Sequence, residues 1–409
     1  MRDTILQVLA PTRRKPRICY LGLSRAPDGP GDPRIFQKQL PALACLGYDV
    51  VALVSGAGKP YDLHGVRIKP SGWSGGLWAR CRHLPDVYRK AVQEQADCYF
   101  FGNFELLPVA ALLKRTTGAR LVYDAMEHFP DMMRVSRQTP RVARPILALG
   151  VDLAERTFRH AMDLLVTADQ PTMTRFQRTR PSVVIHNFPS LRFFDGFDPS
   201  LLASLRRRYA GRRVLVYVGS LGWDRGIREM AEAMVYIKAQ APDVVLAMLG
   251  GWPIDSWRLE YEQLLDRLGV RDVVELCGVI PHVQLGTYLR VADVGLALLE
   301  ESPKHQKNIA TKQFDYMCCG VPVVANNLRP FREFLGCANA GIIINRCEPR
   351  PIADACLRLL GDPSLRYRLG QNGRRKVEQE WNWESQAREL QAAFLRVIPL
   401  DVAQPNAWQ

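Results

Sequence analysis

Short runs of apolar, β-branched residues alternate with longer segments of helical period along most of the chain. This alternation is typical of βα units, in which parallel strands are joined by helices. In the first half the expected strands cover 17–23, 49–55, 97–102, 120–125, 163–168 and 182–187. In the second half they cover 213–220, 244–250, 273–279, 293–299, 321–327 and 341–345. The pattern therefore predicts an α/β protein with two open parallel sheets.

A segment rich in turn formers, FPSLRFFDGFDPS, separates the two groups of strands, and only helical patterns follow residue 347. A chain of 409 residues also favours two domains, because single cores rarely grow beyond about 250–300 residues. We expect a basic N-terminal extension at 1–16, a first doubly wound domain at 17–187, a linker at 188–210, a second such domain at 211–380, a helix crossing back to the first domain at 381–398, and a tail at 399–409.

The composition, 47% hydrophobic and 23% charged, is that of a globular protein. No apolar run reaches the 18 residues or so that a bilayer-spanning helix needs. The first 18 residues place a short apolar stretch before a basic cluster, whereas a secretory signal has the reverse order. We therefore expect a cytoplasmic protein.

The charge is divided unevenly, because residues 1–190 hold 27 Lys/Arg against 16 Asp/Glu, whereas the rest hold 28 against 25. A strongly basic half predicts a surface that binds an anionic partner. Nucleic acid is not expected as that partner, since zinc-finger spacing, aromatic ribonucleoprotein motifs and basic heptad regions are missing from the sequence.

An anionic membrane surface is the partner that we expect for the basic half, and the stretch at 130–160 is where we expect the contact. There, basic and apolar residues are interleaved before the run PILALGVDL: Arg134, Arg137, Arg141 and Arg144 with Met132, Met133, Val135 and Val142. The alternative is a solvated basic helix that packs its apolar side onto its own domain.

The first candidate site follows the strand at 213–220, which ends in GSLGWDRG at 219–226 and leads into a helical pattern. Glycines in this turn allow close approach of the backbone, and the new helix presents free amides to an anion. Arg225 adds a planar donor fork suited to a diphosphate. The alternative is that the turn is only a tight connection.

The second candidate site is TKQFDYMCCGVPVVANN at 311–327, which predicts a short helix between a Thr311 N-cap and Gly320, followed by a strand. Lys312 and Asp315 are three residues apart and so share a face of this helix. A lysine there can bind phosphate, and a carboxylate one turn on can accept hydrogen bonds from a ribose diol. The alternative is a surface ion pair.

Taken together, the segments YVGSLGWDRGI, LGGW, ELCGVIPHVQLGTYLRVADVGLALL, NIATKQFDYMCCGVPVVANN, GIIIN and NGRRKVEQEWNW resemble, in order and spacing, the C-terminal half of the retaining GT-B glycosyltransferases. This family (glycosyl transferases group 1, family 4) includes sucrose synthases and bacterial polysaccharide and mannosyl transferases. The resemblance covers essentially residues 17–398 and is most specific at 293–327. It implies a GT-B fold with two Rossmann-like domains facing a central cleft.

The resemblance also implies the reaction, which is transfer of a sugar from a nucleotide diphosphate sugar to an acceptor hydroxyl with retained configuration. The acceptor is expected to be a glycan or a lipid-linked sugar. Arg225 is implied to bind the donor diphosphate, and Asp315 the nucleotide ribose. The remaining residues that we expect to bind the donor are Gly219, Ser220, Gly226, Gly250, Gly278, Asn308, Ile309, Ala310, Thr311 and Lys312.

The donor half departs from the family pattern at one pair of positions. Many members carry two glutamates separated by seven residues, but Lys307 and Asp315 occupy these positions here. The change leaves the contact to the sugar hydroxyl unassigned, so we expect the backbone amides of residues 309–311 to bind the phosphate and sugar.

The acceptor half departs more strongly from the family. The segment YDAMEHFPD at 123–131 matches one that usually reads Tyr-Asp-x-His-Glu, with Met126 at the histidine position. An upstream His-Asp pair of the family falls on Gly102 and Asn103. A retaining transferase needs a group near the anomeric carbon to stabilise charge or manage a proton, which methionine cannot do.

Glu127 is therefore the expected catalytic group, with Asp124 in support. We expect four residues on the acceptor side: Asp32 and Arg34, which resemble an Asp-x-Arg of the family, together with Asn103 and His128. The alternatives are an acid at a helix N-terminus with a solvated arginine, and a structural role for His128.

No Asp-x-Asp motif occurs, so we expect no cofactor and no metal, with Arg225 and Lys312 providing the positive charge. Two other functions stay open. A GT-B sugar-nucleotide epimerase would need acid and base groups on both sides of the sugar, and a phosphorylase would need a cofactor lysine that we cannot place. A non-catalytic nucleotide-sugar-binding protein would fit the changes at Met126, Gly102 and Lys307.

Overall fold

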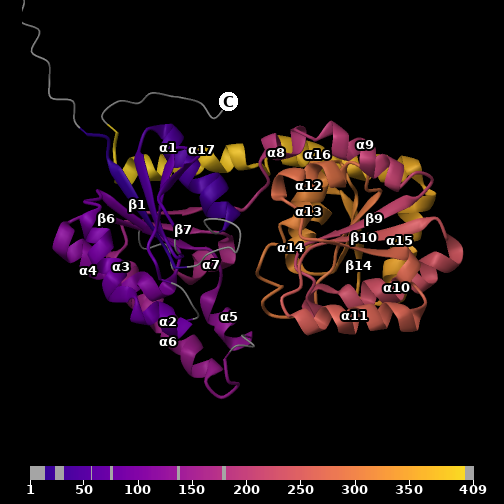
Figure 1. Cartoon of the computed structure of the whole chain (residues 1–409), viewed down its shortest axis with the longest axis horizontal. Helices are drawn as coiled ribbons and strands as arrows, with labels where there is room; N and C mark the ends of the chain where they lie inside the picture. Colours follow the sequence, from indigo (N-terminus) through magenta and orange to yellow (C-terminus); the bar gives the residue numbers. More distant parts are fainter. Residues whose placement is uncertain are drawn as a thin grey trace, which may run out of the picture. The chain divides into compact units, whose positions relative to one another are not determined.

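The computed structural model describes residues 14–23, 32–56, 58–73, 77–135, 139–176 and 181–400. Most of the expected N-terminal extension, the loop at 24–31 and most of the expected tail lie outside the described residues. The chain divides into two compact units (Figure 1). Unit 1 combines the residues up to Ile185 with those from Ala387 onward, and unit 2 covers His186–Gln386.

Unit 1 contains an eight-stranded sheet in the order β3-β4-β2-β1-β5-β6-β7-β8. Its strands are β1 (Arg17–Gly22), β2 (Asp49–Val54), β3 (Tyr61–Leu63), β4 (Val66–Pro70), β5 (Cys98–Phe101), β6 (Arg120–Ala125), β7 (Leu164–Thr167) and β8 (Ser182–Val184). The pairs are parallel except β3–β4, an antiparallel hairpin at the edge. This hairpin was not expected from the sequence, because β3 is short and largely exposed and lacks an apolar run.

Helices cover both faces of this sheet: α1 (Leu40–Leu46), α2 (Leu77–Arg82), α3 (Leu84–Gln93), α4 (Leu107–Thr117), α5 (Phe129–Val135), α6 (Arg144–Phe158), α7 (Gln170–Arg175) and α17 (Trp383–Val397) (Figure 1). Side chains of β5 alternate between the two faces, as the pleat requires. Tyr99 and Phe101 pack with α3, α4 and α6, whereas Phe100 meets Phe394 of α17 with ring centroids 5.5 Å apart. The C-terminal helix is thus part of the core of unit 1 from Ala387 onward.

Unit 2 contains a fully parallel six-stranded sheet in the order β11-β10-β9-β12-β13-β14. Its strands are β9 (Arg213–Val218), β10 (Val244–Leu249), β11 (Val274–Gly278), β12 (Val294–Ala297), β13 (Val323–Asn326) and β14 (Gly341–Ile344). Its helices are α8 (Leu191–Asp195), α9 (Pro199–Arg208), α10 (Ile227–Gln240), α11 (Asp255–Leu268), α12 (His282–Leu289), α13 (Lys312–Cys318), α14 (Arg329–Phe331), α15 (Pro349–Gly361) and α16 (Pro363–Gln379).

The segment 188–210, expected as a linker, is instead an integral part of unit 2. It forms α8 and α9, and the aromatic rings of Phe188 and Phe194 are buried in the core of that unit. Asp198 caps α9 by accepting hydrogen bonds from the backbone N–H groups of Ser200 and Leu201. The turn formers therefore mark a helix boundary, and the units meet in sequence at 185/186.

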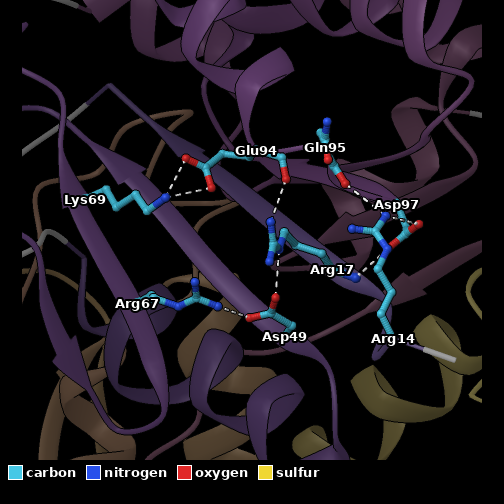
Figure 2. Close-up of polar contacts among 8 residues, drawn as sticks. All are labelled: Arg14, Arg17, Asp49, Arg67, Lys69, Glu94, Gln95 and Asp97. Carbon is cyan, nitrogen blue, oxygen red and sulfur yellow. Dashed lines mark hydrogen bonds and ion pairs between the residues drawn. The ribbon is translucent and has the colours of Figure 1, made fainter. Parts of the chain in front are cut away.

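An ion-pair network lies where the strands of unit 1 begin (Figure 2). Arg17 donates to the Asp49 carboxylate at 2.7 Å, and Arg67 pairs with the same carboxylate. The other pairs in the network are Lys69 with Glu94 at 2.8 Å and Arg14 with Asp97 at 3.2 Å. Much of the positive charge in this region is thus paired with acids of the same unit, mostly at the end of the sheet opposite to the carboxyl ends where such sheets bind ligands.

Candidate donor-binding site

Three glycines lie at the carboxyl ends of adjacent strands in unit 2. Gly219 follows β9 with φ of 127°, Gly250 follows β10, and Gly278 ends β11 with φ of 73°. The N–H of Gly250 donates to the Gly278 carbonyl at 2.8 Å, and a Cβ on Gly250 would lie only 1.8 Å from the Gly219 carbonyl oxygen. Only glycine therefore fits at position 250. The backbones of the three strand ends pack directly against one another at this edge of the sheet.

Lys312 places a buried amine at this edge. Its side chain is 9% exposed, and its Nζ has no hydrogen-bond partner within the described ranges of the chain. The Nζ lies 3.7 Å from the centroid of the Tyr217 ring, and a Cβ on Gly219 would be 3.4 Å from it. Burial lowers the pKa of Lys312 well below its usual value, and the nearby Arg225 adds to this effect. A buried amine without a hydrogen-bond partner is costly, so this position favours an anionic ligand.

Tyr316 holds the helix of Lys312 against the sheet. Its hydroxyl accepts a hydrogen bond from the Val218 N–H at 2.9 Å and donates one to the Leu296 carbonyl at 3.1 Å. Its ring covers Gly295 of β12, where a Cβ would lie 2.6 Å from ring atoms. Because Val218 and Leu296 belong to adjacent strands, Tyr316 fixes α13 at the strand ends. No motif in the sequence pointed to this residue.

The expected Thr311 cap is wrong in detail. Thr311 occupies the N-cap position of α13, but its backbone is helical (φ −63°, ψ −31°) and its side chain makes no capping hydrogen bond. A side-chain cap requires an extended backbone, which the preceding turn does not provide. Gly320 does follow the helix with φ of 69°, as expected. Asp315 is half-buried, one turn after Lys312 on the same face.

Arg225 lies in a helical turn between β9 and α10, with its side chain 30% exposed. It contacts Asp224 at 3.5 Å, and the Asp224 carboxylate lies 3.6 Å from Nε2 of the buried His305. The His305 Nδ1 meets the Glu300 carbonyl at 2.8 Å, and the Glu300 N–H donates to the Asp224 carbonyl at 2.9 Å. Burial, with Arg225 nearby, lowers the pKa of His305. Asp224 and His305 thus join the two donor loops, although no motif spacing pointed to them.

The other expected donor residues lie around these loops. Ser220 is exposed, and its carbonyl accepts a hydrogen bond from the Tyr217 hydroxyl at 2.8 Å. Gly226 packs closely, since a Cβ there would lie 2.9 Å from the Leu298 Cβ. Residues 308–311 are half-buried. The Asn308 N–H donates to the Lys304 carbonyl at 3.0 Å, whereas those of residues 309–311 donate to no other backbone group of the described chain.

Two of the expected acceptor-half residues form a buried ion pair in unit 1. Asp124 is fully buried and accepts hydrogen bonds from Arg34 at 3.1 and 3.2 Å and from the Gln39 amide at 2.9 Å. Arg34 is 3% exposed and also donates to the Ile185 carbonyl at 2.6 Å. This burial contradicts the alternative of a solvated arginine. The expected roles of Asp124 in catalysis and of Arg34 in acceptor binding stay predictions, and the ion pair gives both side chains a structural role instead. Both side chains are used to hold β6, β8 and the first helical turn together.

The remaining acceptor-half residues have different environments. Glu127 is half-buried in the bend after β6, and Asp32 is exposed before the first helical turn. Asn103 accepts a hydrogen bond from the Leu23 N–H at 3.2 Å. His128 lies 3.1 Å from the Asp131 carboxylate at the start of α5, a contact that favours the structural alternative for this histidine.

Met126 and Gly102 contact each other. A Cβ on Gly102 would lie 2.8 Å from the Met126 Cε, and both residues stand at positions where the resemblance expects a histidine. The methionine side chain thus occupies the space that a side chain at position 102 would need. The two departures from the family pattern therefore lie side by side at the carboxyl ends of β5 and β6.

Unit 2 resembles a known protein family in sequence. Residues 206–376 match the sequence model of the family described as glycosyl transferases group 1. Within unit 2, residues 206–376 thus match a group 1 glycosyltransferase domain. This range includes every residue expected to bind the donor, from Gly219 to Asp315, and it confirms the resemblance stated from the sequence.

Curated relatives have similar descriptions. The chain is 25% identical over 321 residues to alpha-D-kanosaminyltransferase of Streptomyces kanamyceticus, covering 76% of this chain and 80% of that one. It is also 25% identical over 305 residues to GDP-mannose-dependent alpha-(1-6)-phosphatidylinositol monomannoside mannosyltransferase of Mycolicibacterium smegmatis, covering 73% and 76%. Both relatives are named as glycosyltransferases.

Solved structures confirm the fold class. Sucrose-phosphate synthase from Thermosynechococcus elongatus superposes with a TM-score of 0.76 at 19% identity, covering 94% of this chain and 99% of that one. HepE from Anabaena, solved with UDP, gives 0.70 at 17% identity, covering 93% and 100%. The GT-B fold of two Rossmann-like domains is thus confirmed. Within the described ranges, no helix is both long and apolar enough to cross a bilayer.

Proposed function

We propose that the chain transfers a sugar, with retained configuration, from a nucleotide diphosphate sugar to a hydroxyl of a glycan or lipid-linked acceptor. The observation that carries the proposal is the buried amine of Lys312 at the strand ends of unit 2, which has no hydrogen-bond partner among the described residues. A diphosphate oxygen at this position would give Lys312 its missing partner in a charge-assisted hydrogen bond. The HepE structure with bound UDP supports a uridine nucleotide as the first donor to test.

The proposal assigns the other donor contacts to residues around Lys312. Arg225 is assigned to the diphosphate, since its guanidinium is half-exposed on the adjacent loop. Asp315, one helical turn from Lys312, is assigned to the ribose diol. The amides of residues 309–311 are assigned to the sugar and phosphate. With two cations in place, the proposal requires no metal ion and no cofactor.

The chemical step breaks the bond between the anomeric carbon and the diphosphate oxygen, and forms a bond from that carbon to the acceptor oxygen. The departing diphosphate carries away the electron pair and accepts the acceptor proton, while Lys312 and Arg225 stabilise its charge. Glu127 is assigned to stabilise positive charge on the sugar. Asp124 is not assigned to this role, because its carboxylate already pairs with Arg34. We place this reaction at the cytoplasmic face of a membrane.

Isothermal titration calorimetry with UDP, GDP and their sugar conjugates tests the donor site. Arg225→Ala should weaken binding roughly 10–100-fold, the effect of losing one hydrogen bond from a charged group. Arg258→Ala is the matched control, because Arg258 is 65% exposed on α11 and pairs with Glu262. Equal binding by both variants would contradict the assignment of Arg225.

Product analysis tests the reaction. With the donor that binds, free nucleotide diphosphate should accumulate only after a sugar acceptor is added. NMR of the product should then show the same anomeric configuration as in the donor. Glu127→Gln should lower kcat more than it raises KM. Donor binding without release of nucleotide for any acceptor or water would instead favour a binding protein, and interconversion of the sugar would favour an epimerase.

A further inference from the structure

Helix α6 of unit 1 exposes a row of large apolar side chains. Ile146, Leu149 and Leu153 are 71%, 67% and 62% exposed, and Val142, in the turn before the helix, is 84% exposed. Their spacings of three and four residues place them on one face of the helix. We call these four residues the α6 stripe. A contiguous apolar row of this kind on a folded protein marks an interaction surface.

The α6 stripe is not a core face that has failed to pack, since the opposite face of α6 is firmly held. Ala148 and Val151 are buried against unit 1, and the carboxylate of Glu155 is buried too. Glu155 accepts a hydrogen bond from the Tyr123 hydroxyl at 2.7 Å and also pairs with Arg175. The rotation of the helix is therefore fixed, and α5 lies beside it (Figure 1).

Positive charge accompanies the stripe. The sequence from Met132 to Val151 contains four arginines and no acidic residue, although Arg134 pairs with Asp131 at 2.6 Å. Arg141 is exposed next to Val142, and Arg156 is 60% exposed one helical turn from Leu153. The acids of α6 are engaged, since Asp152 pairs with Arg156 at 2.8 Å and with Arg175 at 3.0 Å. An apolar row flanked by arginines has the character of a helix that lies in a membrane interface.

We propose that the α6 stripe docks the protein on an anionic lipid bilayer, with Ile146, Leu149 and Leu153 inserted and Arg141 among the lipid headgroups. Docking rests on the proposed function in one respect only, because it would bring the enzyme to a lipid-linked acceptor. The inserted surface is narrower than the sequence indicated, since Met132 and Met133 pack against the core of unit 1.

A second copy of the chain is the competing occupant. In a two-fold dimer each surface meets its own equivalent, so the arginines beside the stripe would face one another across the interface. Like charges brought together in this way are repulsive. A lipid surface with negative headgroups instead complements both the apolar row and its basic flanks.

Vesicle flotation with the full chain tests the proposal. Wild-type protein should float with vesicles of mixed phosphatidylglycerol and phosphatidylcholine, bind pure phosphatidylcholine vesicles weakly, and dissociate at high salt. The triple variant Ile146→Ser, Leu149→Ser and Leu153→Ser should bind at least about 100-fold more weakly, since burial of each side chain accounts for roughly tenfold in affinity. Leu259→Ser, on a leucine 61% exposed on α11, is the control and should bind like wild type.

Three results would overturn the proposal. They are equal binding of the triple variant and wild type, equal binding to neutral and anionic vesicles, and a concentration-dependent dimer in analytical ultracentrifugation that the triple substitution abolishes. Calorimetry with UDP separates this proposal from the proposed function. The triple variant should retain wild-type nucleotide affinity, whereas failure of the wild type to bind any nucleotide would sink the transferase proposal and leave the vesicle result standing.

Discussion

Replacing Lys312 by methionine should make the empty protein more stable and the donor complex weaker. The side chain of Lys312 is 9% exposed, and its Nζ has no hydrogen-bond partner within the described chain. Leaving a buried polar group unsatisfied costs about 1–3 kcal/mol. Methionine has a similar length and makes favourable contacts with aromatic rings, so it can keep the position over Tyr217. Lys312→Met should therefore gain about 1–3 kcal/mol in the free energy of unfolding of unit 2.

This gain should be visible in thermal unfolding. Unit 2 spans His186–Gln386, and a domain of that size shifts its Tm by roughly 2–4 °C per kcal/mol. Calorimetry of wild type and Lys312→Met without nucleotide should thus show an increase of several degrees in the transition of unit 2. The control is Lys304→Met, the same change at a half-buried lysine of the adjacent loop, which should leave Tm nearly unchanged.

Donor binding should change in the opposite direction. A hydrogen bond from a charged group is worth about 1.5–3 kcal/mol, so Lys312→Met should weaken UDP binding roughly 10–150-fold in calorimetry. Lys304→Met should bind like wild type. The reasoning is refuted if Lys312→Met is less stable than wild type and binds UDP equally well, because the amine would then be neither a cost to the empty fold nor a ligand of the phosphate.

The pH dependence follows from the same residue. In the empty site the pKa of Lys312 is lowered by burial, so bound phosphate, which favours the ammonium, should cause uptake of a proton. UDP affinity should then fall as pH rises from this lowered pKa towards the higher pKa that Lys312 has in the complex. For the fold itself, the corresponding window lies between the lowered pKa and the usual 10.5. In the same window the empty fold should gain stability with rising pH, because the unfolded chain binds the extra proton. Binding enthalpies in buffers of different ionisation enthalpy should reveal the proton uptake, and Lys312→Met should abolish it.

Three further substitutions test the support of the two units. Gly250→Ala should destabilise unit 2 by several kcal/mol in urea unfolding, because the new Cβ would lie 1.8 Å from the Gly219 carbonyl oxygen. The control is Gly269→Ala, at a position with open space, which should cost only about 1 kcal/mol because its φ is positive. Tyr316→Phe removes two buried hydrogen bonds and should cost about 1–3 kcal/mol; an unchanged urea midpoint would contradict the bridging role. Asp124→Asn should cost about 3–5 kcal/mol by leaving Arg34 buried without its counter-charge, and a loss of activity with unchanged stability would instead restore the catalytic role.

The strands were largely predictable because parallel strands buried on both faces are continuous apolar runs. All six strands of unit 2 lie within the expected ranges. The hairpin β3–β4 was missed, since its exposed edge strand carries polar residues and lacks such a run. The segment 188–210 was misread for a related reason. Its glycine and prolines suggested a linker, but Phe188 and Phe194 belong to the core of unit 2.

Side-chain roles were less predictable than strands, because a sequence shows the type of a residue and not its burial. Asp124 and Arg34 lie 90 positions apart, and no spacing rule indicates that they form a buried pair. Lys312 could be placed at the donor site through its helix and its neighbours, but its lack of a partner is a property of the folded packing. The contact between Gly102 and Met126 likewise emerges only when β5 and β6 lie side by side.

These placements show which charges are available to bind a ligand. The strongly basic first half of the sequence suggested an anion-binding surface, yet Arg17, Arg67 and Lys69 are paired with acids at the start of its strands, and Arg34 is buried against Asp124. A charge already neutralised within the fold gains little from a ligand, because an existing partner must first be displaced. Unit 2 is nearly neutral by count but contains the buried amine of Lys312, for which the described chain provides no hydrogen-bond partner. An unsatisfied buried amine, and not the net charge, is therefore the feature on which the proposed phosphate contact rests.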